Sequence, residues 1–156
     1  MDFSIRSARV EDAPALSRLM RSLGWFGDLA AEDAATTTVR ITGYLETLSG
    51  ADGCHTVLVV DAGDSGVIGY AAVHWVPYLF LTGEEGYLSQ LFVEEAHRGL
   101  GVGTLLLDAV IAQARERGCS RLSVLTRASR EAYKRGFYTS RGWIEREVMR
   151  NLLYEL

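Results

Sequence analysis

The sequence places an arginine next to closely spaced glycines in Arg98-Gly99-Leu100-Gly101-Val102-Gly103, a combination suited to holding an anion. An apolar run over residues 87–93 comes shortly before it and predicts a central strand covered on both faces. A helical run over residues 104–117 follows and is closed by Gly118. The first amides of a helix have no internal partner, and the helix dipole is positive there. A strand, a glycine turn and a helix in this order therefore predict an anion-binding site.

Two common phosphate-binding motifs do not fit this turn. The phosphate loop of NTPases needs a lysine that Gly103-Thr104 lacks, and the dinucleotide fingerprint needs a third glycine where this chain has Leu106. What remains is Arg-x-x-Gly-x-Gly, formed by Arg98, Gly101 and Gly103. This spacing, directly after an apolar strand, resembles the acyl-CoA loop of the GNAT superfamily of N-acetyltransferases.

A second segment carries the same resemblance. The run Tyr138-Thr139-Ser140-Arg141-Gly142-Trp143 is similar to the family's Tyr-x-x-x-Gly-aromatic motif, so that the likeness spans nearly the whole chain. Two positions depart from the family pattern. Residues 127–130 lack an asparagine that often contacts the cofactor, and Ser129 could hydrogen-bond in its place. Ser89 stands where many members carry a glutamate on the central strand, so the resemblance supplies no glutamate base there.

The elements that must position these motifs follow from hydrophobic periodicity and turn residues. The order expected is β-α-α-β-β-β-α-β-α-β, an α/β fold with a mixed sheet flanked by helices, as in the GNAT fold. The central strand and the strand after the glycine turn are expected to run in parallel. Strands are predicted over residues 3–8, 55–60, 67–76, 87–93 and 121–126, with one or two more in 144–154, and helices over 11–24, 30–48, 104–117 and 128–141.

Length and composition favour a soluble protein with one domain, residues 1–156. The net charge of −4 argues against a nucleic-acid partner or an anionic membrane surface. No apolar run is long enough to span a bilayer, and no secretory signal precedes the first strand, so we expect a cytoplasmic protein. Cys54 and Cys119 have no metal-ligand spacing, and we interpret them as reduced thiols in a protein without a metal.

The resemblance implies transfer of an acetyl group from acetyl-CoA to a primary amine of a small molecule or peptide. Arg98 and the amides of residues 99–104 are expected to hold the pyrophosphate of the cofactor. A β-bulge near residues 91–93 would free backbone groups to bind the pantetheine like an added strand. The cofactor-binding residues predicted in this way are Leu91, Phe92, Val93, Arg98, Gly99, Leu100, Gly101, Val102, Gly103, Thr104, Ser129 and Tyr138.

Tyr138 is the predicted general acid, because a phenol with a pKa of about 10 stays protonated at neutral pH and can donate to the leaving thiolate. Tyr133 is a competing hydroxyl five residues earlier. His74, Glu84 and Glu85 are the candidate bases, and a bound-water relay without a protein base is an open alternative.

A rival hypothesis of a different class is a non-catalytic acyl-CoA-binding module that senses CoA or acts through a partner. A nucleotide-binding domain outside the family is a distant third hypothesis, and the missing lysine and glycine count against it. The loops at residues 25–29 and 77–86 are expected to set the acceptor, but their aromatic and acidic residues do not identify it. The oligomeric state is open as well, a homodimer included.

Overall fold

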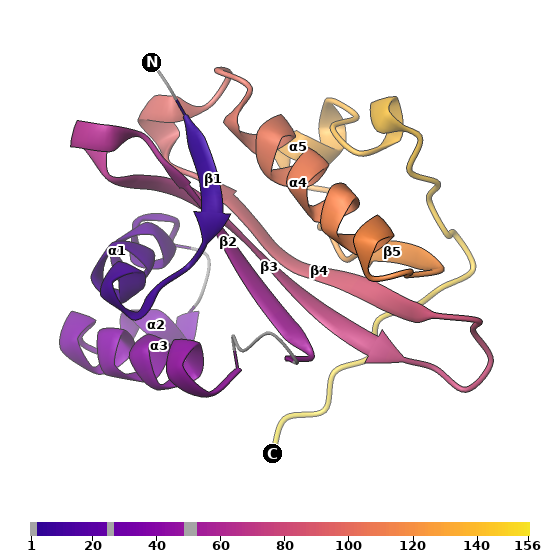
Figure 1. Cartoon of the computed structure of the whole chain (residues 1–156), viewed down its shortest axis with the longest axis horizontal. Coiled ribbons are helices and arrows are strands. Elements are labelled where there is room, and N and C mark those ends of the chain that lie inside the picture. Colours follow the sequence, from indigo (N-terminus) through magenta and orange to yellow (C-terminus); the bar gives the residue numbers. More distant parts are fainter. Residues whose placement is uncertain (1–2, 25–26, 49–52) are drawn as a thin grey trace. The chain divides into compact units, whose positions relative to one another are not determined.

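A computed structural model describes residues 3–24, 27–48 and 53–156 and divides the chain into two compact units, Met1–Val124 and Leu125–Leu156. The first unit contains a five-stranded sheet in the order β1-β2-β3-β4-β5 (Figure 1). Neighbouring strands are antiparallel except β4 and β5, which are parallel as predicted, so the sheet is mixed and the predicted α/β class is confirmed. The strands are β1 (Ser4–Ser7), β2 (His55–Asp61), β3 (Val67–Pro77), β4 (Glu84–Val93) and β5 (Arg121–Val124).

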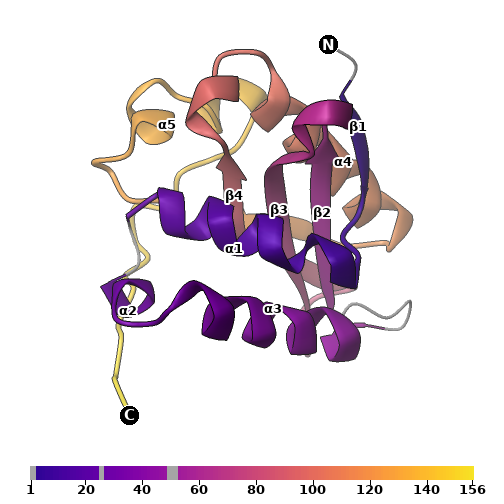
Figure 2. The ribbon, with the colours of Figure 1, turned by 90° about the vertical axis from the view of Figure 1, so that its left-hand side faces the viewer.

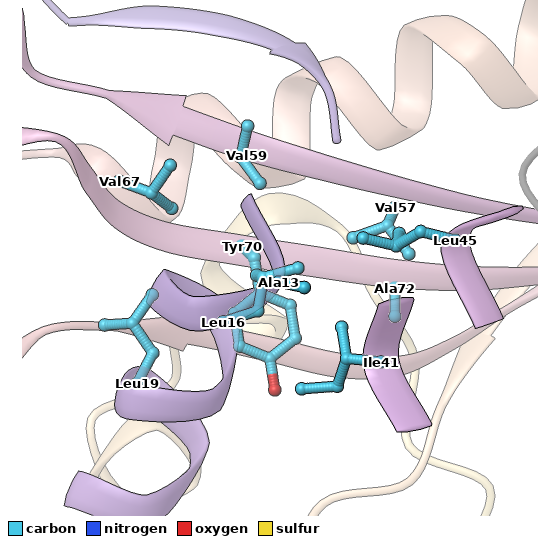
Figure 3. Packing of buried hydrophobic residues seen from close by; sticks show 10 residues of the cluster. All are labelled: Ala13, Leu16, Leu19, Ile41, Leu45, Val57, Val59, Val67, Tyr70 and Ala72. Carbon is cyan, nitrogen blue, oxygen red and sulfur yellow. The ribbon is translucent and has the colours of Figure 1, made fainter. Parts of the chain in front are cut away.

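Helices cover both faces of this sheet (Figure 2). Helices α1 (Ala13–Ser22) and α3 (Ala34–Leu48) lie on one face, with the short α2 (Gly27–Ala30) leading into α3, and α4 (Val102–Glu116) lies on the other face. Short 3-10 turns are η1 (Val10–Asp12), η2 (Gly63–Ser65) and η3 (Glu95–His97). Figure 3 shows side chains of α1 and α3 packed over those of β2 and β3; the cluster comprises Ala13, Leu16, Leu19, Ile41, Leu45, Val57, Val59, Val67, Tyr70 and Ala72.

Gly69 on β3 lies next to both β4 and the first turn of α4. A Cβ atom at this position would come within 2.9 Å of the Phe92 carbonyl oxygen, so a side chain there would clash with the β4 backbone. The same atom would lie 3.5 Å from the Val102 and Leu106 side chains, which is an ordinary contact distance. The start of α4 therefore packs over the part of β3 that pairs with the end of β4.

The β4 strand contains an irregularity at Ser89. Ala72 of β3 pairs with Gln90, but the next residue, Val73, pairs with Leu88, so that Ser89 is an extra residue on β4. The bulge lies earlier than residues 91–93, where the sequence predicted one. An extra residue bends its strand and increases the local twist. The pairing of β4 with β5 covers only Glu85 to Leu88. Within the described residues of the first unit, no strand pairs with residues 89–93 along the edge of β4 that faces β5.

Most predicted boundaries in the first unit lie within about two residues of those observed, and two are further off. The predicted loop over residues 77–86 is shorter, because Glu84, Glu85 and Gly86 already belong to β4. The predicted helix over 30–48 begins only at Ala34, where the Asp33 carboxylate accepts the Thr36 amide at 2.7 Å and caps a new helix. Residues 25–26 of the other predicted loop lie outside the described residues, and the remaining residues, 27–29, belong to α2.

The second unit contains one short helix, α5 (Glu131–Lys134), and a 3-10 turn, η4 (Thr139–Arg141). The predicted helix over 128–141 is wrong, since Gly136 takes a φ of 67° and its amide bonds back to the Tyr133 carbonyl, which ends the helix after one turn. The strands predicted in residues 144–154 are also wrong, because none of these described residues is in a strand. A single domain over residues 1–156 stays a prediction.

Candidate active site

The glycine turn before α4 has the geometry of an anion-binding site. Gly99 and Gly101 have φ angles of 78° and 84°, in the left-handed region that favours glycine, and a Cβ atom on either would meet nothing within 4 Å. No side chain caps the amino end of α4, and its first turn contains no acidic residue. The regular helix bonding begins with the Leu105 amide, 3.0 Å from the Gly101 carbonyl. The earlier amides and the positive helix end therefore suit a phosphate group.

Arg98 connects this turn to the end of β4. Its Nε donates to the Val93 carbonyl at 3.1 Å, and its side chain is exposed. The predicted cofactor residues of the first unit are therefore contiguous. Leu91, Phe92 and Val93 form the last part of β4 beyond the bulge, Arg98 to Leu100 form the turn, and Gly101 to Thr104 form the N-cap and first turn of α4.

A cavity of about 720 Å³ lies on the face of the sheet that α1 and α3 cover. Side chains of α1, α3, β2, β3 and β4 line it. Ser89, at the bulge, and its neighbour Gln90 are among these residues, together with His74 of β3 and His55 of β2. The bulge of β4 thus forms part of the cavity wall.

Two histidines in this wall lie with their rings in contact, tilted at 47° to each other, and belong to a chain of polar contacts. The Tyr44 hydroxyl lies 2.6 Å from His55 Nε2, and the His55 and His74 rings have centroids 4.4 Å apart. His74 Nε2 lies 3.0 Å from the Ser89 hydroxyl, which donates to the Ala72 carbonyl at 3.2 Å. A hydroxyl has one hydrogen to donate, so Ser89 accepts from the Nε2–H of His74. This tautomer leaves Nδ1 as the basic nitrogen of His74.

Burial keeps both rings uncharged. It lowers the pKa of His74 below the ordinary histidine value, because removal from water disfavours the imidazolium. Burial, and secondly the nearby His74, lowers the pKa of His55 to about 4. At neutral pH both imidazoles are therefore neutral, and His74 is in the form that can accept a proton.

The carboxylates of Glu84 and Glu85 have cationic partners on neighbouring elements. Glu84 Oε2 accepts from Arg117 Nη2 at 3.0 Å. Glu85 is buried, and its two carboxylate oxygens accept from Arg121 Nε and from the Ser123 hydroxyl. Neither glutamate lines the cavity.

Tyr138 and Ser129 belong to the second unit. The Tyr138 ring packs edge to face against Phe137 and Trp143, with centroids 5.0 and 5.5 Å apart. Burial raises the pKa of its hydroxyl, so the phenol stays protonated. Ser129 lies in an exposed stretch before α5. The contacts of both residues with a cofactor stay predictions.

His55 and Tyr44 line the cavity but were not predicted as site residues. The register of the β2–β3 hairpin places His55 directly opposite His74, with Val60 opposite Gly69. Counting the register outward from the predicted turn over residues 61–66 would have placed Ala72 opposite His55, because the observed register shifts between Val60 and Asp61. Tyr44 had no signal in the sequence either, since it lies on a helix whose packing depends on the whole fold.

Among the described residues, no group of three or more histidine, cysteine, aspartate or glutamate side chains could hold a metal ion. Within the same part of the chain, no helix is both long and apolar enough to cross a membrane.

Comparisons with known proteins agree on one family. The model of the acetyltransferase (GNAT) family matches residues 22–143. Thialysine N-epsilon-acetyltransferase of Mus musculus is 30% identical over 165 residues, 95% of each chain. Mycothiol acetyltransferase of Clavibacter sepedonicus is 36% identical over 112 residues, which are 70% of this chain and 32% of that protein. The solved glucosamine-6-phosphate N-acetyltransferase from Arabidopsis thaliana shares the fold, with a TM-score of 0.76 at 16% identity over 99% of this chain and 100% of that one.

Proposed function

The chain belongs to the acetyltransferase (GNAT) family, and we propose that it transfers an acetyl group from acetyl-CoA to a primary amine of a small molecule or peptide. Transfer is direct, within a complex that holds both substrates at once. One observation carries this proposal: Ser89 is both the point where β4 stops pairing with β5 and a wall residue of the cavity that contains His74. The bulge therefore adjoins both a cofactor groove and an acceptor pocket.

The cofactor lies along the outer edge of β4 and over the glycine turn. Residues 91–93 offer backbone groups to the amides of pantetheine in the manner of an added strand. Arg98 and the amides of residues 99–104 hold the pyrophosphate, with the positive end of α4 behind it. Ser129 and Tyr138 are further proposed contacts of the cofactor. The two free cysteines, Cys54 and Cys119, fit the reducing cytoplasm as the compartment.

His74 is the proposed base. Its neutral Nδ1 takes a proton from the acceptor ammonium, and the free amine attacks the thioester carbonyl. The new C–N bond forms as the C–S bond breaks, and the Tyr138 hydroxyl protonates the departing thiolate. The second proton, which the new amide nitrogen loses, returns through solvent to the tyrosine oxygen. Glu84 and Glu85 have less support in this role, because each carboxylate already accepts from an arginine. A water relay in place of His74 would leave the rest of the scheme unchanged.

The alternative is a non-catalytic acyl-CoA-binding module. A thiol-release assay separates the two, because only an enzyme liberates free CoA in proportion to added amine. Acetyl-CoA is mixed with a panel of amines that includes amino acids, peptide N-termini, polyamines and alkylamines. We expect amine-dependent CoA release together with a product heavier by one acetyl group in mass spectrometry. Tight binding of acetyl-CoA in calorimetry without release for any amine would favour the binding module.

A further inference from the structure

The acceptor pocket has a mainly apolar wall. On the side of the helices, the lining includes Leu16 and Met20 of α1, Leu29 of α2, and Ile41 and Leu45 of α3. Leu16, Ile41 and Leu45 belong to the hydrophobic core cluster (Figure 3), and Met20 packs against that cluster. An occupant of the pocket therefore places most of its surface against aliphatic groups.

The polar groups of the same wall are paired with one another. Besides the contacts of Tyr44 with His55 and of His74 with Ser89, the Tyr70 hydroxyl donates to Gln90 Oε1 at 2.8 Å. Nitrogen atoms of the two imidazoles remain as further polar sites, and His55 Nδ1 is buried without a hydrogen-bond partner. The wall thus has few polar groups available to recognise hydroxyls on a substrate.

The pocket also has no unpaired carboxylate among the described residues. Its acidic lining residue, Glu32, forms an ion pair with Arg40, also in the lining, and accepts from the Thr37 hydroxyl at 2.8 Å. A second ammonium group in the pocket would lose its water without gaining an anionic partner. Burying an unpaired charge is costly, so this wall selects against amines that carry several charges.

Resting on the proposed acetyltransferase activity, we infer that the acceptor is a monoamine with an apolar body, alkyl or aryl. Its ammonium lies beside His74 and the bulge at Ser89, and its body extends between α1 and α3. A long acyl chain of the cofactor is another apolar occupant, but it needs no proton acceptor. The neutral imidazole in the wall fits the ammonium of an acceptor instead.

The test is a series of straight-chain amines from propylamine to hexylamine, with phenethylamine, spermidine and kanamycin, at saturating acetyl-CoA. We expect kcat/KM to rise about 4-fold per added methylene, the usual effect of burying one such group. Spermidine and kanamycin should lie about 10-fold or more below hexylamine. A flat series, or a polycation that matches hexylamine, would overturn the inference while leaving the acetyltransferase activity intact. Absence of turnover with every amine would overturn both.

A charge placed in the wall gives a second measurement. Leu29→Asp should lower kcat/KM for hexylamine about 10-fold and raise it for spermidine, because the new carboxylate can pair with a second ammonium. Val39→Asp is the matched control, since Val39 is exposed on α3 and does not line the pocket. If Leu29→Asp does not fold, the wild-type series decides alone. A series of acyl-CoA thioesters is run beside it: rates that rise with acyl length and ignore amine length would assign the pocket to the acyl chain and refute the inference.

Discussion

His74 Nε2 lies 3.0 Å from the hydroxyl oxygen of Ser89, the extra residue in the bulge of β4. This contact orients the His74 imidazole at the point where β4 stops pairing with β5. Because Ser89 in turn donates to the Ala72 carbonyl, the ring is held with Nδ1 as its basic nitrogen. The strand irregularity beside the proposed cofactor site thus also orients the proposed base.

Replacing His74 tests the base directly. His74→Gln should lower kcat about 10²-fold, the usual size of a general-base contribution, with little change in affinity for acetyl-CoA. In the wild type, burial lowers the pKa of His74, so the acid limb of the rate profile should have its midpoint below about 6.5. The variant should lack this limb. Ser89→Ala removes only the orienting hydroxyl and should lower kcat less than His74→Gln does. If His74→Gln keeps the acid limb of the wild type, the base is a water relay instead of His74.

A substitution at Gly103 tests the proposed anion site without straining the backbone. It lies in the first turn of α4 and is absent from the glycines with positive φ, so a larger residue is compatible with its backbone. Gly103→Val should raise the dissociation constant of acetyl-CoA about 10-fold or more, because a side chain would stand where phosphate oxygens meet amides. Gly43→Val, in the middle of α3 and outside the cavity wall, is the matched helical control. Equal affinities of the two folded variants in calorimetry would remove the proposed phosphate site.

Much of the first unit was predictable because its signals are local. Alternating or continuous apolar runs located all five strands, and the spacing of Arg98, Gly101 and Gly103 located the turn before α4. The parallel pairing of β4 and β5 followed from the helix between them. The bulge at Ser89 was misplaced, because its position depends on how β3 and β4 pair and not on residue type.

The errors at Glu84, Glu85 and His55 originate in tertiary context, whereas the wrong helix over residues 128–141 has a local cause. Glu84 and Glu85 look like solvated loop residues, but arginines that follow α4 in the chain pair with them and let the strand begin there. In residues 128–141, helix propensity suggested one continuous helix, and the left-handed Gly136 stops it after one turn. His55 was overlooked because its importance comes from its cross-strand neighbour, His74.

Substitutions of Glu84 and Glu85 test whether these carboxylates are structural or catalytic. Glu85→Gln should lower Tm by several degrees, because the Glu85 carboxylate is buried and accepts from both Arg121 and Ser123. Glu84→Gln should change the free energy of unfolding by less than about 1 kcal/mol, since its pair with Arg117 is partly exposed. Neither variant should move the acid limb of kcat/KM. Loss of that limb in either variant would make its carboxylate the base in place of His74.

His55 predicts a pH dependence of stability. Its folded pKa of about 4 lies below the ordinary unfolded value of about 6.5, so between these pH values the unfolded chain binds more protons at this site. The free energy of unfolding therefore falls as pH is lowered through this window, and His55 adds no further loss below it. Urea titrations at pH 7 and pH 4.5 measure how much the free energy of unfolding falls between the two pH values. This fall should be larger in the wild type than in His55→Gln by about 1 to 3 kcal/mol. Equal losses would mean that His55 is solvated enough to titrate normally.

Tyr138 is the proposed acid, and removing only its hydroxyl tests that role. Tyr138→Phe keeps the edge-to-face packing of the ring against Phe137 and Trp143, so the second unit should retain its structure. We expect kcat to fall about 10²-fold with little change in acetyl-CoA affinity, as for loss of a general acid.

Tyr133→Phe is the control, because the Tyr133 hydroxyl donates to the Glu145 carboxylate at 3.1 Å and is held there. It should change kcat far less than Tyr138→Phe. A thioester with a more acidic leaving thiol needs less protonation as it departs, so it should restore much of the kcat that Tyr138→Phe loses. It should not restore the activity that Gly103→Val loses, because that loss comes from weaker binding. Small and equal losses in the two tyrosine variants would leave Tyr138 a packing residue, and a large loss confined to Tyr133→Phe would transfer the acid role to that hydroxyl.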